Sequence, residues 1–320
     1  MKNFYLLLIY LMLIVSCGNP KAPADTSKAQ PFPYTKIPAM LGTEAKAYQY
    51  ISAHFWDDFF NPSRNYIKDT NLVGGVTKSS FENAYLKYLH YLDKNSINNM
   101  LCAQKTLMDK AEEKEKIEPK SIIWKTVTDL SEKYLFDPNS PYRNEEYFIP
   151  VLEKLTKTEL TDSTQKSRYN YLLTLCSLNR LGTPANDFSF TLNNGRTSSL
   201  YKTKANFILL FFSNPGCDNC KEVIDILSSS KEVNLMIKEK RLAVLNIYPD
   251  SDLTEWYNYM KFYPKNWING FDHKMELNSN TIYYIRAVPS LYLLDTDKKV
   301  IFKDGTPKNI LQFLIYQYNF

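Results

Sequence analysis

The chain has 320 residues, a length that suggests about two domains. Apolar residues make up 44% of the sequence and charged residues 23%, a balance that excludes a disordered chain. The net charge is +5, and Lys and Arg form no dense stripe, so nucleic acid is not an expected partner.

Residues 1–16 have the features of a secretory signal peptide. Lys2 precedes an apolar run from Phe4 to Val15, which is too short to span about 30 Å of hydrocarbon as a helix. The run ends in the letters IVSC at residues 14–17, which resemble a bacterial lipobox. That resemblance implies cleavage before Cys17 and acylation of its sulfur, which would anchor the protein to a lipid membrane. An ordinary signal peptide with an incidental cysteine is the alternative.

Export and acylation together predict a lipid-anchored protein of the cell envelope. No carboxylate cluster follows Cys17, so we expect the anchored protein to face the periplasm. Residues 17–36 contain four prolines and lack apolar periodicity, which predicts a flexible linker between the anchor and the folded body.

Residues 37–181 have the pattern of a helical domain of about six helices. Apolar side chains recur at helical spacing in one segment, as Phe81, Ala84, Tyr85, Tyr88 and Leu92. Ser79 has capping-box spacing at the start of that helix. A second helix is predicted to begin at Pro141, and a third to begin near Asp162 and to run to Leu181.

Residues 182–320 change to alternating strands and helices, which predicts an α/β domain. The expected strands are residues 188–192, 207–212 and 242–248 and a hairpin over 290–303; the expected helices follow Cys220 and cover 254–263 and 307–318. The fold class is therefore a two-domain α+β chain, with an all-α domain followed by an α/β domain.

The most informative motif is Cys217-Asp218-Asn219-Cys220, which follows an apolar strand and begins a helix. A structural zinc site would need a second pair of ligands. The sequence has no second such pair, and its three histidines, His54, His90 and His273, are scattered. No metal is therefore expected. A purely structural disulfide would close a very short loop and would stabilise the fold little.

A redox role fits this position better. At a helix N-terminus, Cys217 would meet free backbone N–H groups and the positive end of the helix dipole, and both favour the thiolate. One helical turn would bring Cys220 back beneath Cys217, close enough to resolve a mixed disulfide. The order on the helix predicts that Cys217 is the nucleophile and Cys220 the resolving thiol.

Three blocks of the second domain resemble the TlpA/ResA-like thioredoxin-fold lipoproteins, which are membrane-tethered thiol–disulfide oxidoreductases. The blocks are GTPANDFSFTLNNGRTSSLYK from Gly182, FILLFFSNPGCDNC from Phe207 and AVPSLYLLDTDKKVIFKDG from Ala287. The first domain, with its letters FWDDF, resembles an uncharacterised helical domain that accompanies such lipoproteins.

This resemblance implies a thioredoxin-like fold in residues 182–320 and an oxidoreductase that reduces substrate disulfides. It implies a cis Pro289 opposite the cysteines, and the Val288 backbone could then pair with an extended peptide. The implied partners are proteins with disulfides or thiols and a membrane electron donor of the DsbD/CcdA type. No cofactor is implied.

The sequence departs from the family pattern near the cysteines. Phe211 stands where many thioredoxins carry a buried carboxylate, and Gly216 replaces the tryptophan before the first cysteine. Asp218 lies where ResA-like proteins carry a Glu. A carboxylate there would oppose thiolate formation and so tune the couple toward reduction, although Lys221 could offset that charge.

Two other functions remain alternatives. A thiol peroxidase would need Thr or Ser three residues before the first cysteine, where this chain has Asn214. A non-catalytic binding or scaffold lipoprotein would use the helical domain and keep the thioredoxin fold only as a platform. Cys102 and Cys176 are expected to be buried thiols on helices, or else to form a helix–helix disulfide.

Overall fold

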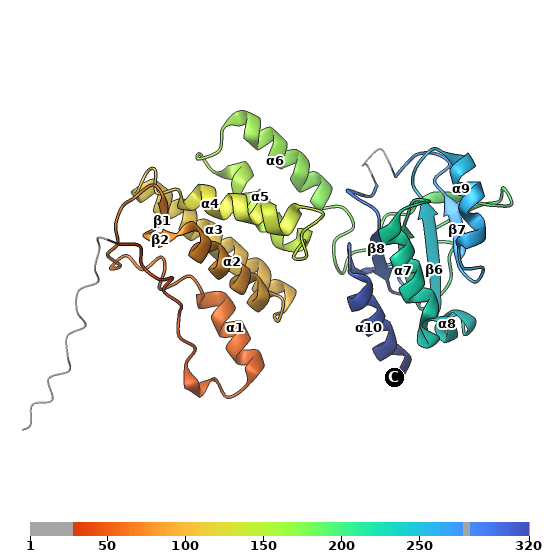
Figure 1. The fold of residues 1–320 in the computed structure, drawn as a ribbon, viewed down its shortest axis with the longest axis horizontal. Helices are drawn as coiled ribbons and strands as arrows, with labels where there is room; N and C mark the ends of the chain where they lie inside the picture. Colours follow the sequence, from red (N-terminus) through yellow and green to blue (C-terminus); the bar gives the residue numbers. More distant parts are fainter. Residues whose placement is uncertain (1–27, 278–281, 320) are drawn as a thin grey trace, which may run out of the picture.

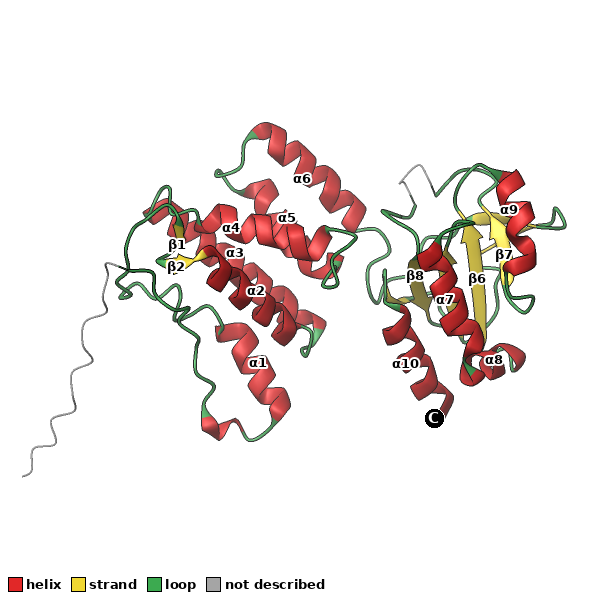
Figure 2. Cartoon of the chain, viewed as in Figure 1, coloured by secondary structure: helices red, strands yellow, loops and turns green. Residues whose placement is uncertain are grey.

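The computed structural model describes residues 28–277 and 282–319 and contains two domains that lie side by side (Figure 1). The first domain is helical and the second is built on a sheet (Figure 2), as the predicted fold class requires. The signal segment and Cys17 lie outside the described residues. Within the described ranges, no helix is both long enough and apolar enough to cross a membrane.

The helical domain has an aromatic core. Its α-helices are α1 (Glu44–His54), α2 (Lys78–Leu92), α3 (Ile97–Ile117), α4 (Ile123–Ser131), α5 (Glu145–Lys157) and α6 (Ser163–Cys176). Shorter elements are η1 (Ala39–Leu41), β1 (Leu72–Val73), β2 (Val76–Thr77) and η2 (Glu132–Phe136). The rings of Phe55, Trp56 and Tyr88 are buried and lie 5.1–5.5 Å apart. Burial of several large rings together removes apolar surface from water and stabilises this domain.

The helix boundaries correct several sequence predictions. Asp162 does cap α6, because its side chain accepts the backbone N–H of Gln165, but the helix ends at Cys176 and not at Leu181. The N-cap of α2 is Thr77, two residues before the predicted Ser79. Helix α5 begins after Asn144, whose side chain accepts two backbone N–H groups, and not at Pro141. An Asn side chain that accepts N–H groups of the first turn stabilises a helix start at that residue, so the helix begins after Asn144 although Pro141 is also favourable at a first helical position.

The linker predicted over residues 17–36 is shorter than expected at its C-terminal end. The backbone N–H of Gln30 donates to Gly75 O at 2.8 Å, and Phe32 is only 5% exposed. The Phe32 ring stacks on Phe59 with 5.4 Å between centroids. Residues 30–32 therefore belong to the helical domain, because burial of the Phe32 ring in the aromatic core stabilises their attachment.

The second domain contains a seven-stranded sheet in the order β4-β3-β7-β6-β5-β8-β9. Its strands are β3 (Ser189–Leu192), β4 (Thr197–Ser199), β5 (Phe207–Phe212), β6 (Leu242–Tyr248), β7 (Ile268–Phe271), β8 (Ser290–Leu294) and β9 (Val300–Phe302). Its helices are α7 (Asp218–Ser229), α8 (Lys231–Lys238), α9 (Leu253–Tyr259), η3 (Met260–Phe262) and α10 (Pro307–Asn319). The sequence prediction missed β4, β7 and α8, which are only 3, 4 and 8 residues long.

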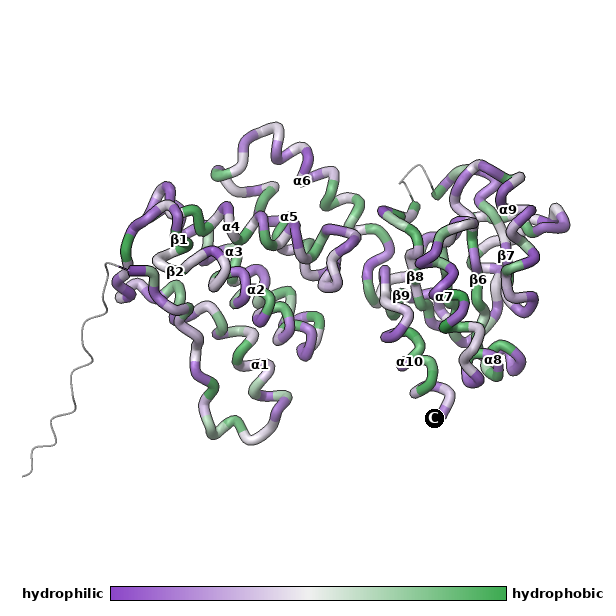
Figure 3. The backbone as a smooth tube through the Cα atoms, viewed as in Figure 1, coloured by the Kyte–Doolittle hydropathy of each residue, from purple (hydrophilic) through white to green (hydrophobic). Residues whose placement is uncertain are grey.

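Strand β5 is central and apolar on both faces. Leu209 and Phe211 face the core beneath helices α7 to α10, whereas Ile208 and Leu210 face a second core covered by the loops around Phe188 and Tyr283. The apolar character of β6 is visible as green tube in Figure 3. Burial on both faces explains why both strands are nearly continuous apolar runs and why both were predicted.

A buried group of charges joins the two domains. Glu145 at the start of α5 lies 3.4 Å from the guanidinium of Arg286 and 2.6 Å from the ammonium of Lys303. The three side chains are 4%, 7% and 5% exposed, respectively. Lys303 also donates to the Cys176 carbonyl at 2.8 Å, so α5 and α6 both contact the second domain.

Candidate active site

The cysteine pair lies at the connection between β5 and α7, at the start of the helix. The strand ends at Phe212, and Gly216 in the following turn has a φ of +70°, a conformation that favours glycine. Cys217 is the N-cap of α7, and its sulfur accepts the backbone N–H of Cys220 at 3.1 Å. The strand–turn–helix context that the redox interpretation requires is therefore present.

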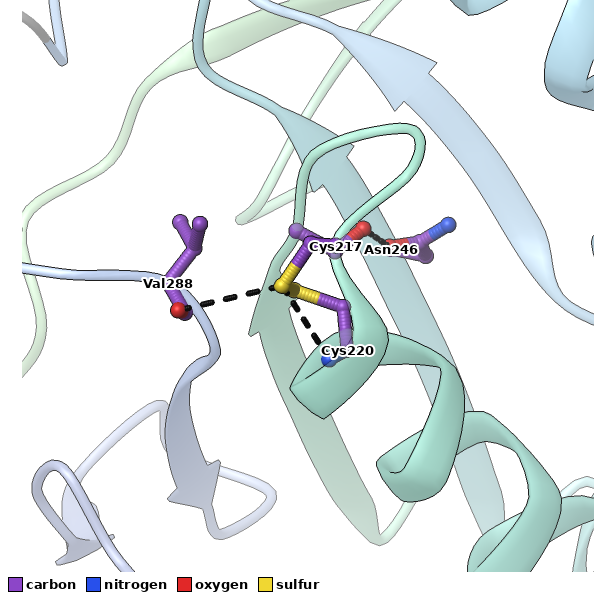
Figure 4. Close-up of a disulfide and its surroundings, with 5 residues drawn as sticks. Cys217, Cys220, Asn246 and Val288 are labelled. Carbon is purple, nitrogen blue, oxygen red and sulfur yellow. Dashed lines mark hydrogen bonds between the residues drawn. A yellow bond between two sulfur atoms is a disulfide. The ribbon is translucent and has the colours of Figure 1, made fainter.

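Cys217 and Cys220 are joined by a disulfide, with 5.2 Å between their Cα atoms (Figure 4). Cys220 is 1% exposed and packs into the core beneath the helices, whereas Cys217 is only half-buried. A bulky partner can therefore approach the first sulfur but not the second.

The loop before β8 faces this disulfide. The Val288–Pro289 bond is cis, as the sequence predicts. The carbonyl oxygen of Val288 lies 3.9 Å from the Cys217 sulfur and points toward it (Figure 4). Antiparallel pairing of β5 with β8 brings the two segments together, because Phe212 lies opposite Ser290.

Asp218 is exposed on the first turn of α7. The sequence left open whether Lys221 offsets its charge. Lys221 donates instead to Asp225, at 2.5 Å, one turn further along the helix. The carboxylate nearest to the redox pair in sequence therefore has no direct ion pair with Lys221.

A buried polar group beneath the turn was missed by the sequence analysis. The side chains of Ser213 and Asn246 lie 2.5 Å apart, and Asn246 donates to Asn269 at 3.0 Å. These residues come from the end of β5, from β6 and from β7. The available signal was Asn246 itself, a lone polar residue within the otherwise apolar run of β6.

The other two cysteines are free and differ from each other. Cys176 is buried, as expected, but Cys102 is exposed, which corrects the expectation that both are buried thiols. The alternative of a helix–helix disulfide is also not observed. Burial, reinforced by the charge of Glu145, raises the pKa of the Cys176 thiol to about 12. Cys176 is therefore an unreactive thiol at neutral pH.

No group of three or more His, Cys, Asp and Glu side chains within residues 28–277 and 282–319 has an arrangement that could hold a metal ion. The reactive groups that the structure places at this site are the sulfurs of Cys217 and Cys220. A half-buried sulfur at a helix N-terminus and a buried partner one turn later suit thiol–disulfide exchange.

These features define a two-domain protein whose second domain has a thioredoxin-like fold. The family described as thioredoxin-like matches residues 206–300, and the domain of unknown function DUF5106 matches residues 16–179. The chain belongs to the DUF5106 family and carries a thioredoxin-like domain after it. A search of curated proteins found no match.

Solved structures include one that resembles the whole chain. A thioredoxin-like protein from Bacteroides caccae is 35% identical, with a TM-score of 0.79, over 90% of this chain and 99% of that one. The C-terminal domain of an uncharacterised Bacteroides fragilis protein is 42% identical over 43% of this chain and 98% of its own, with a TM-score of 0.42. The thioredoxin domain of a Bacteroides vulgatus thiol-disulfide oxidoreductase is 20% identical over 42% of this chain and 98% of its own, with a TM-score of 0.38.

Proposed function

We propose that this protein is a thiol–disulfide oxidoreductase of the cell envelope that reduces disulfides in other proteins. The observation that carries the proposal is the difference in exposure between the two sulfurs: Cys217 is half-buried and faces the Val288 carbonyl, whereas Cys220 is buried. Such a pair can form a mixed disulfide at one sulfur and resolve it with the other.

In the proposed reaction, the Cys217 thiolate attacks one sulfur of a substrate disulfide. A new bond forms between Cys217 and the substrate, and the other substrate sulfur leaves as a thiolate and takes up a proton. Cys220 then loses its proton and attacks Cys217, which releases the second substrate thiol. The substrate gains two electrons, and the protein is left with the Cys217–Cys220 disulfide, which is the state of this structure.

The test is reduction of insulin by dithiothreitol, followed as turbidity. The wild-type chain should accelerate the reaction, and Cys217→Ser and Cys220→Ser should each abolish the acceleration. Cys102→Ser is the matched control, because Cys102 is exposed but lies in the helical domain. A rate unchanged by Cys217→Ser would contradict the proposal and would favour a binding or scaffold role.

We also propose that acylated Cys17 anchors the protein to a membrane, with the domains facing the periplasm. A membrane dithiol donor of the DsbD/CcdA type would then return two electrons to the Cys217–Cys220 disulfide. The lipobox-like letters IVSC at residues 14–17 support the anchor. Cells fed radiolabelled palmitate should label the wild-type protein but not Cys17→Ser, and a label that persists in Cys17→Ser would contradict the anchor.

A further inference from the structure

A cleft of about 390 Å³ lies beside the redox pair, and both domains form its walls. Its lining includes Asn139 and Arg143 from the helical domain, Asn219 and Val223 from α7, and Val288 and Pro289 from the loop that faces Cys217. We propose that this cleft binds the extended segment that flanks the disulfide of a substrate protein, so that the helical domain forms one wall of the binding site. This inference rests on the proposed function.

The position of the cleft follows from the covalent chemistry. In a mixed disulfide, the substrate sulfur is bonded to Cys217 Sγ, which lies 3.9 Å from the Val288 carbonyl oxygen. Val288 and Asn219 both line the cleft, and Val288 also contacts the reacting sulfur, so the cleft lies directly next to Cys217. The substrate backbone on that side must therefore pass across the cleft.

The lining mixes apolar and polar side chains in equal number and carries no net charge. Val223, Val288 and Pro289 supply apolar surface, and Glu222 and Lys308 contribute one charge of each sign. The remaining cation, Arg143, is paired with Asp304 at 2.9 Å. A volume of this size holds several side chains, and a lining with no net charge favours an uncharged segment over a strongly acidic or basic one.

The two walls are held together by the buried charges between the domains. Arg286, two residues before Val288, contacts Glu145 of α5, and its guanidinium lies 4.8 Å from the centre of the Phe136 ring. Arg286 also donates to the Phe136 carbonyl. The loop that faces the redox pair is thus fixed directly to the helical domain, and the cleft is a pre-formed feature of the two-domain chain.

The first test fills the cleft from the helical side in the full chain. Asn139 is exposed and lines the cleft, so Asn139→Trp should obstruct it without touching the sulfurs. Asn170→Trp is the matched control, because Asn170 is exposed on α6 and is not among the lining residues. We expect Asn139→Trp to lower kcat/KM for insulin by about tenfold and to leave the reduction of bis(2-hydroxyethyl) disulfide unchanged.

An Asn139→Trp effect on insulin no larger than that of Asn170→Trp would overturn the inference. Equal losses with both disulfides would also overturn it, since they would indicate a distorted redox pair. If the wild-type chain reduces neither disulfide, the proposed function fails, and a binding measurement that requires no turnover then decides the inference.

That measurement uses the double variant Cys102→Ser/Cys220→Ser, because the exposed Cys102 would otherwise also react, and an extended, uncharged peptide with one cysteine activated by 2-nitro-5-thiobenzoate. Cys217 displaces the nitrothiobenzoate and forms a stable mixed disulfide, and a benzophenone side chain two residues away is then irradiated. Cross-links should map by mass spectrometry to residues 138–143. Cross-links confined to the second domain would show that the helical domain is not a wall of the site.

Discussion

At the residue scale, the two cysteines of the motif should differ in reactivity. Cys217 is half-buried at the start of α7 and Cys220 is buried, so iodoacetamide should label Cys217 first in the reduced protein near pH 6. Cys102→Ser should serve as the background, because Cys102 is exposed. Cys176 should stay unlabelled until the protein unfolds, since burial raises its pKa to about 12. Peptide mapping would measure the order, and faster labelling of Cys220 would reverse the assignment of nucleophile and resolving thiol.

Asp218 should keep the redox couple reducing. Its carboxylate opposes the thiolate at Cys217, and Lys221 is engaged by Asp225. We therefore expect a potential nearer thioredoxin's value of about −270 mV than the value of about −120 mV of a strong oxidant. Asp218→His should raise the potential by about 30 mV, because it removes a negative charge beside the thiolate.

Titration in glutathione buffers would measure both potentials. Asp297→Asn is a suitable control, since Asp297 is exposed in the turn between β8 and β9, at the end of β8 far from Ser290. A wild-type value above about −180 mV, or a fall in Asp218→His, would contradict a reducing role and would favour oxidase or isomerase activity.

At the scale of elements, the contact between α3 and α5 should be sensitive to acid. Burial alone would raise the pKa of Glu112, but hydrogen bonds from Lys154, Thr158 and Lys116 outweigh it and lower the pKa to about 2. A lowered carboxyl pKa stabilises the folded state above the unfolded value of about 4.5, and that stability is lost as the pH falls toward 2.

The expected loss from this group is about 2 kcal/mol between pH 6 and pH 3, and Glu112→Gln should remove that part of the pH dependence. Urea unfolding of both proteins at the two pH values would measure it. Glu113→Gln is the control, because Glu113 is exposed on the same helix. Equal pH dependence in Glu112→Gln and the wild-type protein would show that the contact contributes nothing to acid stability.

At the scale of the whole molecule, the buried charges should hold the domains together. Glu145 is 4% exposed and contacts both Arg286 and Lys303, so Glu145→Gln leaves two buried cations with one anion fewer. Loss of one partner from a buried pair costs about 3–5 kcal/mol. The exposed pair of Lys125 and Asp129 offers a control, since Asp129→Asn should cost less than about 1 kcal/mol.

Urea unfolding followed by tryptophan fluorescence would compare the two variants, and limited proteolysis would report on domain separation. Glu145→Gln should shift the transition to lower urea and expose the segment between the domains. A shift no larger than that of Asp129→Asn would mean that the interdomain charges add little to stability.

Local sequence is enough to predict the central strands, the cysteine motif and a helical domain followed by an α/β domain. Strands β5 and β6 are apolar runs buried on both faces, so local composition alone specifies them, and the turn before Cys217 follows directly from Asn214, Pro215 and Gly216. The predicted cis bond before Pro289 also depended on local sequence, namely the block that resembles the family.

The contacts between polar groups far apart in sequence become known only from the folded chain. Asn246 and Ser213 lie 33 residues apart in sequence, and Glu145 and Arg286 belong to different domains, so no local pattern links either pair. Phe32 likewise lies among prolines that predict a linker, and its place in the core is seen only from its contacts with the rings of Phe59 and Trp56. Periodicity reports the face that an element buries, whereas its contact partner depends on the packing of the whole chain.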